Sequence, residues 1–153
     1  MKVKINNIIF DEKVYPRFDL DNEVVNRYKQ ALDNLPPIIL SADMRLIDGK
    51  HRLRAHQLEN REDIEAEILN ITDDTAILKE AIKRNATHGQ QLSREEKKSL
   101  ARRLWESTIV EDIAKLLSVS TGLVSNWTTD LEDHRKDEEK QKIIELYLKC
   151  KNT

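Results

Sequence analysis

The sequence has few of the residues that mark several large classes of protein. Of its 153 residues, one is a cysteine, 5% are aromatic, three are glycines and three are prolines. The single cysteine, Cys150, cannot form a disulfide within the chain, and no metal-ligand partner stands at a suitable spacing beside it. This composition argues against a disulfide-rich secreted domain and fits a reducing cytoplasm.

Long apolar runs are also missing. No run approaches the roughly 18 to 20 residues that span a bilayer, and the N-terminus lacks the apolar core of a signal peptide. We therefore expect a cytoplasmic protein with no membrane partner. Charged residues make up 35% of the chain, and with so few aromatics this favours helices with charged faces over an all-β sandwich.

Apolar periodicity predicts an α+β unit with a small mixed sheet in the first 88 residues, in the order strand, helix, hairpin, helix, strand, helix. The predicted strands cover residues 2–10, 38–40, 45–47 and 64–69. The predicted helices cover residues 22–34, 50–59 and about 74–82, with caps at Asp21 or Asn22 and at Asp73 or Asp74. In this order, the second strand of the hairpin, residues 45–47, is followed by a turn that leads directly into the helix at residues 50–59.

That turn reads Asp48-Gly49-Lys50-His51-Arg52. A helix N-terminus offers unpaired N–H groups and partial positive charge, and a glycine lets a ligand approach the backbone closely. Lys50, His51 and Arg52 would add further donors for phosphate oxygens. The pattern predicts a phosphate seat, and the structural alternative is a strand-turn-helix with a solvated basic face.

The stretch Asp-Gly-Lys-His-Arg-Leu-Arg-Ala, residues 48–55, resembles the Gly-x-Arg-Arg-x-x-Ala box of ParB N-terminal domains. It is still more similar to the Asp-Gly-x-His-Arg form of the wider ParB/sulfiredoxin superfamily. The resemblance implies a site for a nucleoside triphosphate. Sulfiredoxin has a catalytic cysteine where Lys50 stands here, so sulfiredoxin chemistry is excluded.

Two further segments extend the resemblance. Pro16-Arg17 falls where ParB-like domains have a Pro-Arg pair beside the nucleotide, and residues 83–93, which include His88, resemble the third ParB box, with Asn85 on its asparagine. Arg84 occupies the place of a glutamate that supports the metal and hydrolysis in the family. Since arginine cannot ligate Mg²⁺, binding is favoured over turnover. The predicted nucleotide-binding residues are Arg17, Gly49, Lys50, His51, Arg52 and Asn85, with no metal ligand assigned.

Residues 111–127 have the pattern of a DNA-binding helix-turn-helix. Ala114 is small where two helices cross, Ser118-Val119-Ser120 forms a short turn, and Val124 points into the core of the pair. A run of basic residues precedes this pattern and would attract phosphates. Thr121, Ser125, Asn126 and Thr128 are expected to face outward. The predicted DNA-binding residues are Lys97, Lys98, Ser120, Thr121, Ser125, Asn126 and Thr128.

The predicted domains are 1–88 for nucleotide binding, 89–132 for DNA binding and 133–153 for a C-terminal helix. Residues 130–140 are interpreted as a charged connector or a solvated helix start. The last helix carries an apolar stripe with Ile143, Leu146, Tyr147 and Cys150, which would cover the helix-turn-helix core, pair with another subunit, or begin a further region. A homodimer is expected.

The favoured function is that of a ParB-like DNA-binding protein that acts in partition or in transcriptional regulation. A plasmid or a phage is the expected setting. It would bind double-stranded DNA and a nucleoside triphosphate with Mg²⁺, CTP being favoured by the resemblance and ATP remaining open. Enzymatic activity would be at most weak triphosphate hydrolysis. One alternative is a small-molecule kinase or nucleotide hydrolase with Asp48 as catalytic candidate. Another is a DNA-binding regulator whose nucleotide site has decayed.

Overall fold

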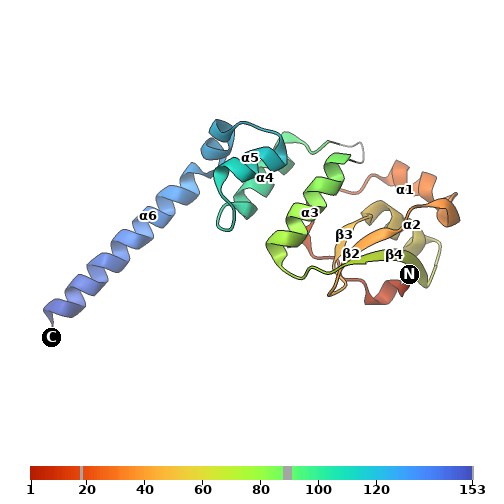
Figure 1. Cartoon of the computed structure of the whole chain (residues 1–153), viewed down its shortest axis with the longest axis horizontal. Coiled ribbons are helices and arrows are strands. Elements are labelled where there is room, and N and C mark those ends of the chain that lie inside the picture. The colour runs from red at the N-terminus through yellow and green to blue at the C-terminus, as the bar shows by residue number, and fades with distance from the viewer. Residues whose placement is uncertain (18, 88–90, 153) are drawn as a thin grey trace. The chain divides into compact units, whose positions relative to one another are not determined.

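The computed structural model describes residues 1–17, 19–87 and 91–152, which form two compact units, Met1–Glu96 and Lys97–Thr153 (Figure 1). Each unit is described by itself. The predicted domain boundary between residues 88 and 89, and His88 with it, lies outside the described residues. Among the described residues, no helix is both long and apolar enough to cross a membrane.

A four-stranded mixed sheet with the order β1-β4-β2-β3 is the centre of the first unit. Its strands are β1 (Lys2–Lys4), β2 (Ile38–Ser41), β3 (Leu46–Asp48) and β4 (Asp63–Leu69). Strand β4 runs antiparallel to β1 and parallel to β2, and β3 is the antiparallel hairpin partner of β2. The predicted α+β class with a small mixed sheet is confirmed.

The first strand is shorter than predicted. It ends at Lys4, and a 3-10 turn, η1 (Ile5–Asn7), follows instead of a strand through residue 10. The Ile5 N–H donates to the carbonyl of Glu62, and the Ile8 N–H turns back to the carbonyl of Ile5. Polar and apolar residues stop alternating at this point, and the chain returns to the sheet only through an isolated bridge between Ile9 and Arg45.

Helices α1 (Asn22–Lys29), α2 (Lys50–Leu58) and α3 (Asp74–Thr87) complete the first unit. The Asp21 side chain caps α1 by accepting the N–H groups of Glu23 and Val24. The prediction that α1 continues to residue 34 was wrong. The Gln30 and Ala31 N–H groups bond three residues back, which tightens the last turn, and a separate 3-10 helix η3 (Leu32–Asn34) carries Leu32 into the core.

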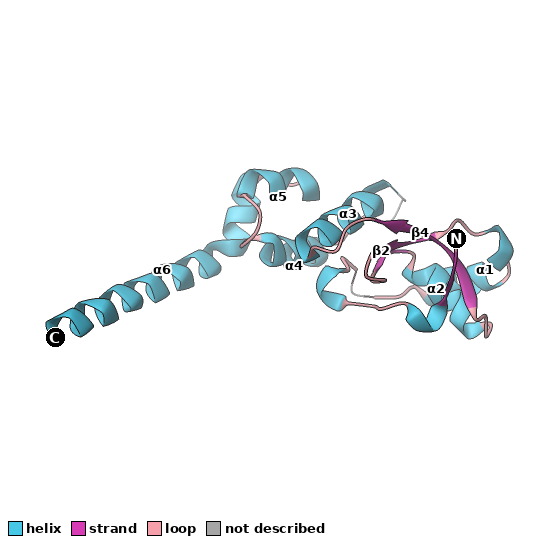
Figure 2. Ribbon diagram, turned by 60° about the horizontal axis from the view of Figure 1, so that its bottom comes forward, coloured by secondary structure: helices cyan, strands magenta, loops and turns pink. Residues whose placement is uncertain are grey.

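Apolar side chains fill both faces of the sheet, and Figure 2 shows α2 and α3 beside its strands. One cluster joins Ile38, Leu40 and Ala66 of the sheet to Leu53 of α2. The other cluster joins Ile39 and Ile47 to α3; its α3 members are Ile77 and Ala81. Each face of the sheet thus packs against its own helix, α2 on one side and α3 on the other. The start of β2 and the end of β3 lie between these two helices.

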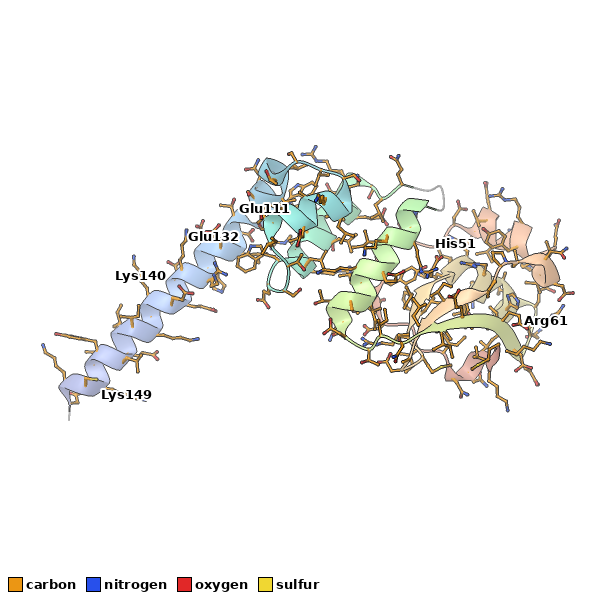
Figure 3. All side chains as sticks on the ribbon, viewed as in Figure 1. His51, Arg61, Glu111, Glu132, Lys140 and Lys149 are labelled. Carbon is orange, nitrogen blue, oxygen red and sulfur yellow. The ribbon has the colours of Figure 1, made fainter. Side chains whose placement is uncertain are left out.

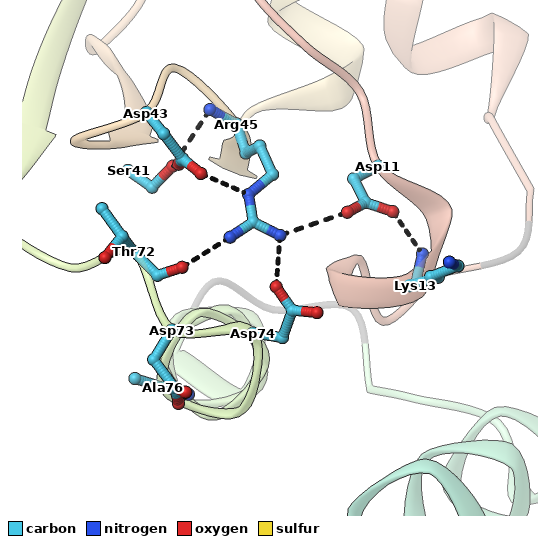
Figure 4. Close-up of polar contacts among 9 residues, drawn as sticks. All are labelled: Asp11, Lys13, Ser41, Asp43, Arg45, Thr72, Asp73, Asp74 and Ala76. Carbon is cyan, nitrogen blue, oxygen red and sulfur yellow. Dashed lines mark hydrogen bonds and ion pairs between the residues drawn. The ribbon is translucent and has the colours of Figure 1, made fainter.

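Arg45, at the start of the hairpin's second strand, holds three segments together (Figure 4). Its side chain is 11% exposed and donates to Asp74 Oδ1 at 2.6 Å, Asp11 Oδ2 at 3.2 Å and Asp43 Oδ2 at 3.0 Å. A further N–H donates to the Thr72 carbonyl at 2.7 Å. The guanidinium thus ties the hairpin to the start of α3 and to the loop after β1.

The helices of the second unit are α4 (Arg94–Leu104), α5 (Val110–Leu117) and α6 (Thr121–Lys151). The first turn of α4 precedes Lys97, where this unit begins. A capping box starts α4, because Ser93 Oγ accepts the Glu96 N–H and the Glu96 carboxylate accepts the Ser93 N–H. The core contains buried residues of all three helices: Leu100, Leu104, Ile113, Leu117, Val124 and Trp127.

Helix α6 is continuous for 31 residues, so residues 130–140 are helical and do not connect two elements. Pairs four residues apart, Lys136 with Glu132 and His134 with Glu138, line this solvated stretch. Of the three alternatives for the C-terminal stripe, coverage of the core of this unit is contradicted by its exposure. Ile143, Leu146 and Tyr147 are each 60% or more exposed.

Candidate functional site

A cleft of about 540 Å³ in the first unit brings the predicted phosphate-binding residues together. Its walls come from the loop at residues 15–17, α1, the Pro36-Pro37 segment, the start of β2, the end of β3, the middle of β4, the first turn of α2 and the last turns of α3. All six predicted nucleotide-binding residues line it: Arg17, Gly49, Lys50, His51, Arg52 and Asn85. Asp48, the catalytic candidate, lines it as well.

Gly49 makes the turn into α2 in a conformation that other residues rarely adopt, with φ at +113°. A Cβ added there would lie 2.6 Å from Ile38 Cγ2, and Ile38 is fully buried. Glycine is therefore required both by the backbone conformation and by the close approach of β2. The start of α2 faces the cleft only because this turn is possible.

Tyr15 is a site residue that the sequence did not reveal. Its hydroxyl accepts the Lys50 N–H, one of the free donors at the start of α2, at 3.3 Å. Burial raises the pKa of Tyr15 to about 12, so the hydroxyl stays protonated and keeps a proton to donate. The nearest signal in the sequence is its position directly before Pro16-Arg17.

His51 joins the start of α2 to the start of α1. Its Nε2 accepts the Asp21 N–H at 3.0 Å (Figure 3, where His51 is labelled). Burial lowers the pKa of His51, and the charge of Arg17 lowers it further, so the ring is neutral at pH 7. In this state His51 orients α1 against α2 and adds no positive charge to the cleft.

Arg52 has most of its donors occupied within the protein. It donates to the carbonyls of Pro36 and Pro37 at 3.0 Å and 2.6 Å, and to Asp48 Oδ2 at 3.2 Å. Its side chain is only 13% exposed. Arg52 thus fixes the segment before β2 and neutralises Asp48, and its contact with phosphate oxygens stays a prediction.

Lys50, Arg17 and Asn85 present donors to the cleft. The Lys50 ammonium lies 4.6 Å from the centre of the Phe10 ring and 5.9 Å from that of Tyr15, contacts that leave its N–H groups available. Arg17 Nε donates to Asn85 Oδ1 at 2.8 Å. Asn85 Nδ2 is buried and has no hydrogen-bond partner within the described chain. An unpaired buried donor is costly, so this atom indicates an acceptor supplied by a ligand.

Other residues line the cleft as well, and of these only Arg84 is singled out by the sequence. Val24, Tyr28 and the two prolines offer apolar surface that suits a flat ring or a sugar. Arg27 and Arg84 add positive charge, and Arg84 Nε donates to Glu80 Oε1 at 3.0 Å. Glu67 is a carboxylate on β4.

The second unit has two helices joined by the predicted short turn. Ser118 ends α5 in the left-handed conformation, and the Ser120 hydroxyl accepts the Leu123 N–H to cap α6. Thr121, Ser125 and Asn126 are exposed, as predicted for residues that face outward. Of the predicted lysines, Lys98 is exposed and Lys97 half-buried.

Thr128 does not face outward as predicted. It is 3% exposed, and its hydroxyl donates to the Val124 carbonyl at 2.9 Å within α6. Trp127 takes the adjacent buried position, so two successive residues point inward where the helix meets its neighbours. Arg102, part of the basic run before α5, is also occupied, because it forms a two-pronged pair with Asp130 at 2.6 Å and 2.9 Å.

Comparison with known proteins gives matches to solved structures; no family model and no curated protein matches. The chain is similar to the C-terminally truncated chromosome-partitioning protein ParB from Caulobacter crescentus complexed to the centromeric parS site. The identity is 21% and the TM-score 0.54, covering 83% of this chain and 69% of that one. A pNOB8-like ParB N-domain is 18% identical with a TM-score of 0.53, covering 86% and 47%. The C2221 form of a Pnob8-like ParB-N domain is 17% identical with a TM-score of 0.51, covering 86% and 50%. The chain spans about half the length of these two, and its fold is ParB-like.

Proposed function

We propose that the cleft of the first unit binds a nucleoside triphosphate and that α5 and α6 bind double-stranded DNA, as expected of a ParB-like partition or regulatory protein. The unpaired, buried Asn85 Nδ2 carries the nucleotide proposal, since it requires an acceptor in a cleft that is otherwise rich in cations. The ParB-like fold supports the pairing of the two activities. The proposal includes a homodimer, the form in which many DNA-binding proteins read symmetric sites.

The residues present fit a triphosphate. Gly49 lets phosphate oxygens approach the first turn of α2, and Arg17, Lys50 and Asn85 donate to them from three sides. Tyr15 orients the first N–H of the helix, and Tyr28 with Pro36 and Pro37 would cover the base or sugar. We favour CTP over ATP because the sequence resembles ParB N-terminal domains.

The arrangement favours binding over chemistry. Asp48 is the residue that a kinase or hydrolase would use as a base, but Arg52 holds it in an ion pair at 3.2 Å. Among the described residues, no group of three histidine, cysteine, aspartate or glutamate side chains is placed to hold a metal ion. Mg²⁺ would therefore bind together with the phosphates, where it would neutralise their charge.

Replacing Arg17 by glutamine tests the nucleotide site. Arg17→Gln removes a cation from the cleft and disturbs Asn85, so we expect calorimetric affinity for the preferred triphosphate to fall by about tenfold or more. Arg54→Gln is the matched control, because Arg54 is exposed on α2 and outside the cleft lining. Equal affinity in the two variants, with circular dichroism unchanged, would refute the phosphate assignment.

Asn126 and Lys98 test the DNA proposal as a pair. Asparagine reads adenine edges in the major groove, so Asn126→Ala should reduce the preference for a selected sequence by about 1 to 3 kcal/mol while leaving the salt dependence alone. Lys98→Ala should weaken binding to all sequences alike and lower the salt slope by about 1. Fluorescence anisotropy at several salt concentrations measures both effects. Identical behaviour of the two variants would contradict the assignment of α6 to base recognition.

A further inference from the structure

Glu67 is placed by β4 on the side of the cleft that α3 forms. Side chains alternate along β4, with Ile64 and Ala66 buried on one face and Glu67 on the other. Its parallel partner on β2 is Ile39, which packs against Ala81 of α3. One turn further along α3, Arg84 and Asn85 line the same cleft as Glu67.

Glu67 is exposed at the cleft and lies among more cations than carboxylates. Among the described residues, five cations line the cleft, namely Arg17, Arg27, Lys50, Arg52 and Arg84, against two carboxylates, Asp48 and Glu67. Asp48 is neutralised by Arg52. Glu67 makes no hydrogen bond or ion pair with any residue in the described part of the chain. The cleft thus keeps one carboxylate without a cation of its own, in a place suited to an anionic ligand.

A lone carboxylate here opposes the binding of a polyphosphate. Like charges in one cleft repel, so the Glu67 carboxylate and a polyphosphate bound beside it disfavour each other. A divalent cation between the two anions reverses the sign of the interaction, because Mg²⁺ accepts one or two carboxylates together with phosphate oxygens and keeps its remaining waters. The protein offers no cluster of three metal ligands among the described residues, so this cation would bind only with the ligand.

We propose that Glu67 is the carboxylate through which a divalent cation joins the triphosphate to the cleft. The inference rests on the proposed nucleotide binding and adds to it a metal contact from β4. The cation and the nucleotide then bind cooperatively, each supplying ligands or charge that the other needs. Glu67 also becomes the residue that makes affinity depend on Mg²⁺.

Calorimetric titration of the full chain with CTP and with inorganic tripolyphosphate, in Mg²⁺ and in EDTA, tests the proposal. For the wild type, we expect Mg²⁺ to strengthen binding by about tenfold. Glu67→Gln should bind more weakly than the wild type in Mg²⁺ and more tightly in EDTA, because the repulsion disappears with the charge. Tripolyphosphate should show the same reversal, since the contact involves no base or sugar.

Glu65→Gln is the matched control, because Glu65 is on the same face of β4, outside the cleft lining, and paired with the N-terminal amine at 3.1 Å. It should bind as the wild type does in both conditions. A loss in Glu67→Gln that is equal in Mg²⁺ and EDTA would assign Glu67 to a sugar hydroxyl or base amino group and overturn the proposal. No change in either condition would overturn it too. If neither the wild type nor the two variants bind either probe, the proposed nucleotide binding itself fails. That outcome differs from the two above, in which the wild type binds and only the role of Glu67 is overturned.

Discussion

Gly49→Ala is expected to abolish detectable nucleotide binding while leaving the second unit folded. The new Cβ would lie 2.6 Å from Ile38 Cγ2 and would occupy a backbone conformation with φ at +113°. Ile38 is fully buried between the sheet and α2, so it has no room to withdraw. Strain of about 1 to 3 kcal/mol is relieved only by moving the start of α2, which displaces the donors at the cleft. Calorimetry should show no binding at nucleotide concentrations that saturate the wild type.

Gly122→Ala provides the control. A Cβ added at Gly122 meets no atom within 4 Å, and the residue lies in the first turn of α6. Alanine favours the helix over glycine by about 1 kcal/mol, so this variant should be slightly more stable than the wild type and bind nucleotide normally. If Gly49→Ala binds a triphosphate as tightly as Gly122→Ala does, the turn before α2 is not the phosphate seat.

Arg45→Met should cause the largest loss of stability in the first unit. Methionine keeps much of the apolar stem but leaves Asp11, Asp43 and Asp74 without the cation that they share. It also leaves the Thr72 carbonyl without its donor. The guanidinium is 11% exposed, but Asp43 and Asp74 are 43% and 69% exposed, so solvent screening reduces the expected loss to about 1 to 3 kcal/mol. Urea unfolding followed by circular dichroism measures the change.

Arg61→Met is the comparison for Arg45. Arg61 pairs with Asp33 at 3.6 Å, and the two side chains are 50% and 84% exposed. Ion pairs of this kind contribute about 0 to 1 kcal/mol, so the midpoint of unfolding should barely change. Similar losses in the two arginine variants would show that the Arg45 cluster is not a structural clamp.

The sequence predicted those parts of the fold that depend on local pattern. Gly49 marked the turn before α2, and the spacing of Ala114 and Val124 marked two crossing helices. Each of these signals comes from residues within about one or two helical turns. Boundaries were predicted less well, because the end of α1 depends on where Leu32 finds space in the core.

The roles of individual site residues depended on contacts that no local pattern contains. Arg52 is predicted to contact phosphate, but its bonds to the carbonyls of Pro36 and Pro37, 15 or more residues away, have no local signal in the sequence. Tyr15 and Glu67 reach the cleft from other elements, and no motif marks them. Thr128 was assigned to the outer face from its position alone, whereas the packing of Trp127 turns that part of α6 inward.

In the proposed function, the first unit binds nucleotide and the second unit binds DNA. The first unit has a cleft with fixed donors, a neutral His51 and a neutralised Asp48, which are the properties of a binding site more than of a catalytic one. The second unit presents uncharged polar side chains at the start of α6, suited to reading base edges. A nucleotide in the first unit would then act as a regulator of how the protein holds DNA.

Calorimetric titration of the wild-type protein with CTP, ATP, GTP and UTP in Mg²⁺ tests this account most directly. We predict saturable binding of one triphosphate per chain, tightest for CTP and lost in Gly49→Ala. The absence of binding by all four triphosphates to protein that is folded by circular dichroism would contradict the account. Binding that persists unchanged in Gly49→Ala would contradict it equally.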